Sequence, residues 1–93
     1  MVGLVRAVPG QCRLALLYLD AERQGQGWGR RLHDAGLDLL RAAQCRHAEL
    51  WTLEGNTGAG AFYAARGWTP DGRRRDLDVA GTPLVEIGYR RAL

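Results

Sequence analysis

The sequence predicts a single α/β domain, with a mixed sheet flanked by helices, over residues 1–93. Three observations lead to this prediction. Residues 14–19 form an unbroken apolar run, which is typical of a strand buried on both faces. A polar, glycine-containing segment follows and leads into apolar residues at helical spacing. Short strand-like segments then alternate with one short helical segment, and 93 residues suffice for one core.

The first half of the chain is expected to form a hairpin and a helix. Residues 2–8 are apolar and partly β-branched, and Pro9-Gly10 is a turn dipeptide. We therefore expect residues 2–8 and 12–19 to pair as antiparallel strands. A helix is predicted over residues 27–45, because its apolar positions recur at spacings of three and four. These positions are Trp28, Leu32, Ala35, Gly36, Leu39, Leu40 and Ala43.

The second half is expected to add a strand parallel to residues 12–19, because a helical crossover joins parallel neighbours. Asn56 or Thr57 is suited to cap the short helix that follows, and Gly67 is suited to end it. The predicted elements are a strand at 47–53, a helix at 58–66, a strand at 68–74, a turn-rich connection at 76–82 and a last strand at 83–90.

The charged residues exclude some chemistry and favour an anionic partner. All 13 basic residues are arginines, which excludes a P-loop lysine and a lysine nucleophile. A net charge of +3 suits an anion without distinguishing a nucleotide, a nucleic acid or a membrane surface. Arg73-Arg74-Arg75 is expected to be a solvated turn or strand end, with a nucleic-acid or phosphate contact as the alternative.

The cysteines and the hydropathy pattern favour a cytoplasmic protein. Cys12 and Cys45 lack CxxC spacing, so we expect reduced, buried thiols. No apolar run approaches the roughly 18 residues of a membrane span, and no signal peptide precedes the first strand. We therefore expect no membrane partner.

The glycines between the first buried strand and the helix predict an anion site. Helix N-termini carry unpaired N–H groups and partial positive charge, and glycine lets a phosphate approach the main chain. The dinucleotide pattern G-x-G-x-x-G fails in both registers, whether it begins at Gly25 or at Gly27. The pattern present is Gln24-x-x-Gly27-x-Gly29. Arg30 and Arg31 oppose the helix dipole unless an anion is bound there, which weakly supports such a ligand.

A second constellation lies after the next predicted strand, namely Asn56-x-x-Ala59-x-x-Phe62-Tyr63-x-x-x-Gly67-Trp68. Together, in this order, the two motifs resemble those of the GNAT superfamily of acyl-CoA-dependent N-acyltransferases, from about residue 2 to the C-terminus. The resemblance implies a GNAT-like fold, acetyl-CoA as co-substrate, an amine on a small molecule or protein as acceptor, and direct acyl transfer.

The resemblance also assigns binding residues. Main-chain groups of Leu17, Tyr18 and Leu19 would pair with the pantetheine arm like an added strand. Asn56 would bond to the pantetheine or the adjacent phosphate region. The pyrophosphate would be bound by the first motif, which begins at Gln24, through the backbone amides of Gly25, Gln26, Gly27, Trp28, Gly29 and Arg30.

Tyr63 is the predicted catalytic residue, a general acid that protonates the departing thiolate. A phenol with a pKa near 10 is a workable donor to a thiolate whose conjugate acid has a pKa near 8.5. The alternative is a helix tyrosine that only packs on the sheet. The general base stays open between Glu54, Asp20 and an ordered water. We expect His33 and His47 to be solvent-facing or satisfied polar groups, and no metal site.

The chain departs from the family pattern at its start. The family's usual N-terminal strand, two helices and further strand are missing, so we expect an N-terminally truncated fold. The chain is then a short member, a fragment or a chain completed by a partner, and the sheet edge favours a homodimer. Ala21 stands where many relatives have proline. Two alternatives remain: a non-catalytic CoA-binding module, and an arginine-driven nucleic-acid binder, which we rank low.

Overall fold

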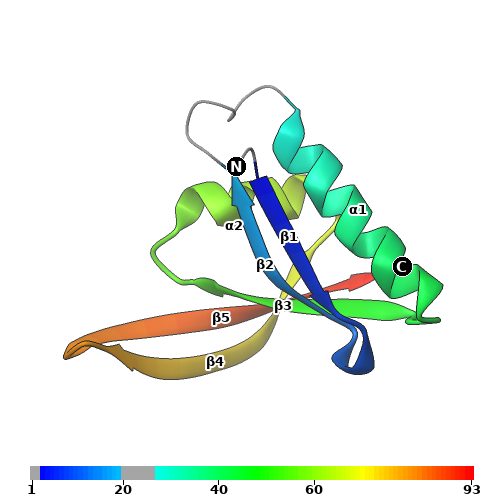
Figure 1. Cartoon of the computed structure of the whole chain (residues 1–93). Coiled ribbons are helices and arrows are strands. Elements are labelled where there is room, and N and C mark those ends of the chain that lie inside the picture. Colours follow the sequence, from blue (N-terminus) through cyan, green and yellow to red (C-terminus); the bar gives the residue numbers. More distant parts are fainter. Residues whose placement is uncertain (1–2, 20–26) are drawn as a thin grey trace. The chain divides into compact units, whose positions relative to one another are not determined.

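The structure is a computed structural model that describes residues 3–19 and 27–93, with side chains for residues 5–15 and 27–93 (Figure 1). The predicted α/β class, a mixed sheet with two helices, is confirmed. The chain divides into an N-terminal unit, residues 1–48 and 92–93, and a C-terminal unit, residues 49–91. The elements are β1 Gly3–Val8, a 3-10 turn Pro9–Gln11, β2 Arg13–Leu19, α1 Trp28–Ala42, β3 His47–Leu53, α2 Thr57–Ala65, β4 Thr69–Val79 and β5 Thr82–Ala92.

The N-terminal unit begins with the predicted antiparallel hairpin, in which β1 pairs with β2 from Gly3↔Leu19 to Val8↔Arg13. The Pro9-Gly10 turn predicted between the strands is a 3-10 turn. It closes when the N–H of Cys12 donates to the carbonyl of Pro9 at 3.1 Å. Cys12 takes a left-handed conformation to do so, with φ of 48°.

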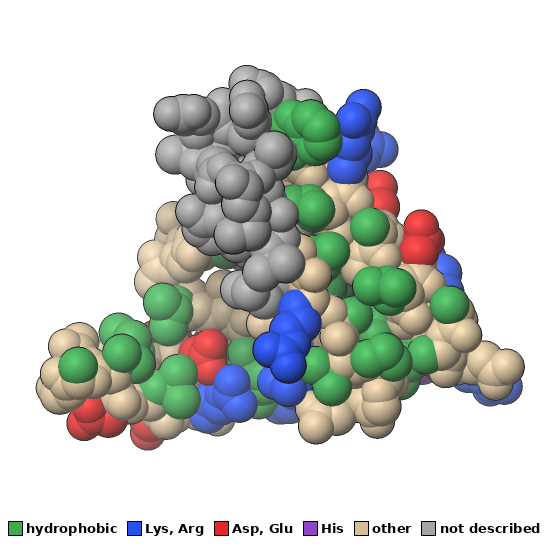
Figure 2. Space-filling view, in the orientation of Figure 1, with side chains coloured by type: hydrophobic (Ala, Val, Ile, Leu, Met, Phe, Trp, Pro, Cys, Tyr) green, Lys and Arg blue, Asp and Glu red, His purple; other side chains and the backbone are tan. Residues whose placement is uncertain are grey.

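α1 packs on this hairpin through a stripe that overlaps the predicted one in part: Gly36 and Leu40 are buried as predicted, whereas the predicted positions Ala35, Leu39 and Ala43 are exposed. Its buried residues are His33, Gly36, Leu37 and Leu40. Leu39 is 53% exposed, and hydrophobic side chains reach the surface over α1 (Figure 2). Gly36 is the reason, because a Cβ there would lie 2.7 Å from Leu14 Cδ1. The helix therefore approaches the hairpin at Gly36, where it carries no side chain.

α1 ends at Ala42, earlier than predicted, and the chain then brings two cysteines together. Gln44 is left-handed, with φ of 66°, and the N–H of Cys45 donates to the Leu40 carbonyl at 3.1 Å. Cys45 thereby meets the turn between β1 and β2, where it forms a disulfide with Cys12 at a Cα–Cα distance of 5.7 Å. The expectation of reduced thiols is wrong, because sequence spacing does not show which turns meet in space.

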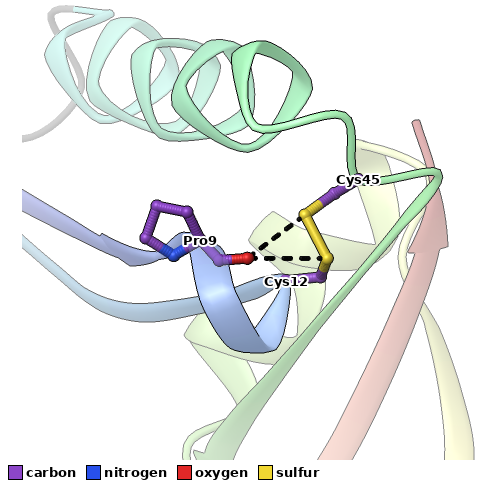
Figure 3. The surroundings of a disulfide bond; sticks show 3 residues. All are labelled: Pro9, Cys12 and Cys45. Carbon is purple, nitrogen blue, oxygen red and sulfur yellow. Dashed lines mark hydrogen bonds between the residues drawn. A yellow bond between two sulfur atoms is a disulfide. The ribbon is translucent and has the colours of Figure 1, made fainter.

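The carbonyl of Pro9 faces both sulfurs of this disulfide (Figure 3). Its oxygen lies 3.7 Å from Cys12 Sγ and 3.5 Å from Cys45 Sγ. A disulfide sulfur carries no proton, so these are contacts and not hydrogen bonds in the oxidised protein. The two thiols would donate weakly to the same oxygen after reduction.

The C-terminal unit is built on β3, β5 and β4, which neighbour one another in that order. β3 has the bounds predicted for it. β4 and β5 form a long antiparallel hairpin, drawn in orange tones in Figure 1, that pairs Val79 with Thr82 at its tip. Ala80 and Gly81 form the two-residue turn with φ of 51° and 84°, as type I′ hairpins require. The turn lies inside the connection predicted over residues 76–82, but the predicted extent is wrong, since cross-strand pairing extends both strands into it.

α2 joins β3 to β4 and has no buried residue of its own, so the core of the C-terminal unit comes from residues outside this helix. Leu50, Trp68 and Tyr89 are buried. Gly67, with φ of 88°, turns the chain out of the helix as predicted, and the N–H of Trp68 donates to the Tyr63 carbonyl at 3.1 Å.

No helix among the described residues is long and apolar enough to span a bilayer.

Replacing both Cys12 and Cys45 by serine should lower the free energy of unfolding, because the disulfide restricts the unfolded chain across a separation of 33 residues. Loop-closure entropy gives a loss of roughly 3–4 kcal/mol. Urea unfolding followed by circular dichroism measures it. Reductant should move the native midpoint toward that of the variant and leave the variant unchanged. Equal midpoints for variant and oxidised protein would contradict this prediction.

Gly36→Ala should destabilise the protein by about 1–3 kcal/mol through overpacking, although alanine favours helix. The new Cβ would meet Leu14 at 2.7 Å and Val5 at 2.8 Å. Gly58→Ala in α2 is the matched control, since its Cβ would meet only Asn56 Oδ1 at 3.8 Å. In thermal unfolding, the midpoint of Gly36→Ala should lie below that of the native chain and the midpoint of Gly58→Ala above it. A Gly36→Ala protein as stable as the control would argue against the close approach.

Candidate functional site

The start of α1 has the geometry of an anion site. Gly27 is its N-cap residue in the left-handed conformation, with φ of 81° and no side-chain cap hydrogen bond. The N–H of Arg31 donates to the Gly27 carbonyl at 3.1 Å, which makes Arg31 the first residue bonded within the helix. Helix geometry thus leaves the N–H groups of Gly27, Trp28, Gly29 and Arg30 without intrahelical acceptors.

Gly27 itself is not crowded by the part of the chain that the structure describes. A Cβ added there would meet no described atom within 4 Å. Trp28 is half-buried, and the Arg31 guanidinium lies 5.2 Å from the centroid of its ring. Three residues of the predicted pyrophosphate motif, Gln24, Gly25 and Gln26, lie outside the described residues, as does the candidate base Asp20.

The predicted pantetheine segment, Leu17 to Leu19, is the end of β2. Its main chain pairs with β1, with Val5 opposite Leu17 and Gly3 opposite Leu19. Main-chain groups alternate in direction along a strand, so β1 engages one edge of β2 in this segment. A contact between this main chain and pantetheine stays a prediction.

Asn56 is the N-cap residue of α2. It is one of the two residues, Asn56 and Thr57, predicted as the cap. Its Oδ1 accepts a hydrogen bond from the Ala59 N–H at 3.0 Å. One side-chain oxygen therefore satisfies an N–H at the helix start. The side-chain amide nitrogen is not used by the cap and carries two donors.

Tyr63 lies one turn further along α2 than Gly60, among aromatic rings. Its ring centroid is 5.4 Å from that of Phe62 and 5.9 Å from that of Trp68, both edge-on. Burial raises the pKa of the Tyr63 phenol above its ordinary value near 10. The hydroxyl therefore stays protonated, and able to donate, throughout the neutral range.

Phe62 and Tyr63 face different surroundings, as expected for adjacent helix residues. The guanidinium of Arg66 lies 3.7 Å from the centroid of the Phe62 ring, and Arg66 Nη1 donates to the Phe62 carbonyl at 2.9 Å. Phe62 thus packs against an arginine of its own helix, while Tyr63 packs toward the strands.

The candidate bases are placed differently from one another. Glu54 Oε2 is bound by the guanidinium of Arg74, and this pairing raises the pKa of Arg74.

Of the two histidines, His33 is buried and its Nδ1 lies 2.9 Å from Asp34 Oδ1, so it is a satisfied polar group and not solvent-facing. His47 is exposed. Within the described parts of the chain, no three His, Cys, Asp or Glu side chains group as for a metal ion.

The three consecutive arginines lie inside β4, which corrects the expected turn or strand end, while Arg74 and Arg75 are exposed as expected of solvated residues. Arg73 Nε donates to Asp71 Oδ2 at 2.7 Å, and Arg75 Nη2 lies 2.7 Å from Glu86 Oε1. Arg74 pairs with Glu54. Acidic and basic side chains accordingly lie side by side over the β4–β5 hairpin in Figure 2. Each of the three guanidinium groups thus has a carboxylate partner, although the side chains remain partly exposed.

Arg73 depends on a glycine that sequence reasoning did not single out. Its guanidinium crosses β5 at Gly88, where a Cβ would lie 2.7 Å from Nε. It then lies 4.6 Å from the centroid of the Trp51 ring, with Nη1 3.4 Å from Glu49 Oε2. The register of β4 against β5 shifts between Pro70 and Arg74, around Gly72 with its φ of 86°. Gly72 and Gly88 are visible in the sequence, but only the strand register shows that both lie beside Arg73.

Comparison with known proteins decides the family. The model of the acetyltransferase (GNAT) family matches residues 1–68, nearly three quarters of the chain. The chain belongs to the GNAT family. The match contains both motifs from which the resemblance was inferred, the glycine segment before α1 and the Asn56 to Trp68 segment. The GNAT-like fold expected from them is confirmed.

Solved structures show the same fold for this GNAT chain. A GCN5-related N-acetyltransferase of Rhodopseudomonas palustris superposes with a TM-score of 0.84 at 22% identity, over 99% of this chain and 54% of that protein. A GNAT acetyltransferase of Elizabethkingia anophelis with acetyl-CoA bound gives a TM-score of 0.78 at 14% identity, over 100% of this chain and 69% of that protein.

Among curated proteins, the mycothiol acetyltransferase of Beutenbergia cavernae is 42% identical over 55 residues, which are 59% of this GNAT chain and 18% of that relative. The chain thus spans about half of the first of the solved structures and a smaller part of the curated relative. The similarity supports acetyltransferase chemistry in general, and the particular reaction is a matter for proposal.

The Asn56 cap can be tested on stability alone. Asn56→Ala should destabilise the protein by about 1 kcal/mol, because the Ala59 N–H loses its acceptor. Asn56→Asp keeps an accepting oxygen and adds a charge favoured at a helix start, so its unfolding midpoint should stay close to the native one. Chemical unfolding of both variants provides the measurement. An aspartate variant that unfolds as easily as the alanine variant would contradict the cap.

Proposed function

We propose that this GNAT chain transfers an acetyl group from acetyl-CoA directly to an amine acceptor. The observation that carries the proposal is the family match over residues 1–68, which includes the open start of α1 and the Tyr63 segment. The acetyl-CoA bound in the structurally similar Elizabethkingia anophelis protein supports this co-substrate. The acceptor is proposed only as an amine, on a small molecule or on a protein.

In this proposal the N-terminal unit binds the pyrophosphate and pantetheine of acetyl-CoA. The residues proposed to bind the pyrophosphate run from Gly25 to Arg30, with Gln24 at the start of the motif. The uncapped N–H groups at the start of α1 suit this role, since they point toward the N-terminal end of the helix, where its dipole favours an anion. The main chain of Leu17, Tyr18 and Leu19 would hold the pantetheine.

Tyr63 is the proposed general acid. The amine nitrogen forms a bond to the thioester carbonyl carbon while the carbon–sulfur bond breaks, and the departing thiolate takes the phenol proton. Because partial burial raises the pKa of the Tyr63 phenol, the hydroxyl is protonated at neutral pH and can already donate a hydrogen bond as charge develops on sulfur. The amine gives up its own proton to a base, for which Asp20, Glu54 and an ordered water are the candidates. The Glu54 carboxylate is engaged by Arg74.

A second candidate is a CoA-binding module without transferase activity of its own. It rests on the uncapped start of α1, whose N–H groups could bind a pyrophosphate with or without acyl transfer. Acetyl-CoA binding without transfer across a panel of amines would favour the module.

A homodimer is also proposed, because β1 has β2 as its one neighbour among the described strands. Light scattering that shows a monomer at high concentration would count against the dimer.

Gly27→Val should abolish acetyl-CoA binding in a calorimetric titration, because a branched side chain at this position would block the close approach of a phosphate to the main chain. The matched control is Gly81→Val. Gly81 has φ of 84° against 81° for Gly27, and a Cβ at either position meets no atom within 4 Å. Both variants carry similar backbone strain, roughly 1–2 kcal/mol. The control should still bind. Equal binding by the two variants, or no binding by the folded native chain at millimolar acetyl-CoA, would refute the proposed site.

Tyr63→Phe should lower kcat by about 100-fold, the lower end of general-acid effects, while acetyl-CoA affinity stays near the native value. Because burial raises the Tyr63 pKa above its ordinary value, its proton is retained to high pH. The native kcat profile should therefore show no falling limb from Tyr63 below about pH 10. Steady-state kinetics between pH 6 and 10 would check both statements. Undiminished turnover of Tyr63→Phe would remove the acid role and leave the binding proposal standing.

A further inference from the structure

Tyr89 of β5 lies against α2 at a place where no side chain comes between them. It is 7% exposed, and a Cβ added at Gly60 would lie 3.1 Å from its hydroxyl oxygen. Gly60 precedes Tyr63 by one helical turn, so the two positions share a face of α2. The phenol of Tyr89 therefore reaches the helix directly beside the base of the Tyr63 side chain.

The rings of Tyr89 and Trp68 both contact the Tyr63 ring. The Tyr89 centroid is 6.3 Å from the Tyr63 centroid with the planes tilted by 47°, and the Trp68 centroid is 5.9 Å away at 68°. Both distances lie in the range of favourable aromatic pairs, about 4.5–7 Å. Tyr89 and Trp68 are themselves buried, at 7% and 3% exposed, so they are fixed by the core of the C-terminal unit.

We propose that Tyr89 is a positioning residue that holds the phenol of Tyr63 in place for proton donation to the leaving thiolate. This inference rests on the proposed acid role of Tyr63. The Tyr89 ring supplies a fixed wall beside the Tyr63 ring, and Gly60 provides the room that lets Tyr89 stand there. A misplacement of about 1 Å in a reacting group can cost on the order of 100-fold in rate.

Removal of the Tyr89 ring should have two linked effects. The Tyr63 side chain gains freedom to leave its donating position. Water also gains access to a phenol whose pKa is raised by burial. The pKa of that phenol should then fall toward about 10, its value in water.

Titration of the Tyr63 phenol tests the packing without any reference to catalysis. The chain has 3 tyrosines, so a Tyr18→Phe, Tyr89→Phe variant leaves Tyr63 as the one phenol that titrates. Its tyrosinate absorbance is compared with that of a Tyr18→Phe, Tyr89→Leu variant. We expect a raised pKa where the phenylalanine ring remains and a lower pKa where leucine replaces it. The same pKa in two folded variants would overturn the proposal.

Kinetics test the consequence for the reaction, in chains that keep Tyr18. Tyr89→Leu should lower kcat by about tenfold, part of the general-acid contribution of 100-fold or more, with KM for acetyl-CoA unchanged. In a Tyr63→Phe background the same substitution should cost nothing further, since the positioned group is gone. An additive loss would overturn the positioning role. A fully active Tyr63→Phe chain would instead refute the acid role, and Tyr89 would then have a packing role alone.

Gly60→Ala serves where the leucine variant does not fold. Its Cβ would crowd the Tyr89 hydroxyl at 3.1 Å, so Tyr89 must shift by a few tenths of an ångström. We expect kcat to fall several-fold. Adding Tyr89→Phe removes the crowded oxygen while keeping the ring, and should recover most of the lost kcat. Failure of this second substitution to restore turnover would contradict the contact between Gly60 and Tyr89.

Discussion

The close approach of α1 to the β1–β2 hairpin at Gly36 is the constraint on which the N-terminal unit depends. Leu14 Cδ1 and Val5 Cγ2 occupy the space where a side chain at position 36 would stand. This contact selects the face that α1 buries, and so it places Leu37 and Leu40 in the core while Leu39 faces solvent. Since a helix packs as a rigid body, the same contact also fixes the direction of the α1 start.

The disulfide acts on the same packing from the other end of α1. Cys45 follows the helix and Cys12 belongs to the turn between the hairpin strands, so the bond ties together the two elements that Gly36 brings into contact. Both ends of this link use left-handed backbone, at Cys12 and at Gln44. Left-handed non-glycine residues cost on the order of 1 kcal/mol each, which the cross-link and the packing together offset.

Local patterns predicted much of the fold, and pairing between distant segments accounts for what they missed. The bounds of β3 and the Asn56 cap follow from a short apolar run and from turn chemistry nearby in sequence. The α1 face, by contrast, depends on Leu14 and Val5, more than 20 residues away, and the periodicity does not show which helical stripe has room to approach a hairpin. The extent of β4 likewise depends on its register with β5, which the Gly72 bulge shifts.

The candidate site shows the same contrast between features that local patterns predict and features that depend on distant residues. Gly27, Asn56 and Tyr63 could be named because motifs carry them, and the comparisons support the family from which the motifs come. Tyr89 could not be named, because its partner is the bare backbone of Gly60 in a helix far from it in sequence. The longer-range ion pairs of Arg73 to Arg75 were equally out of reach, since strand register brings near their partners Glu49 on β3, Glu54 just after β3 and Glu86 on β5.

The two helix starts differ in a way that bears on function. α2 begins with a side-chain cap from Asn56, which stabilises the start of the helix without a ligand. α1 begins with no side-chain cap and no acidic residue in its first turn, and its first turn contains Arg30 and Arg31. A side-chain cap contributes about 1 kcal/mol, and cations at this end oppose the dipole by a few tenths to 1 kcal/mol each. A pyrophosphate would accept from the N–H groups and neutralise both arginines. The start of α1 is therefore unfavourable as part of an empty fold and favourable as part of an anion site, as expected where local rules yield to function.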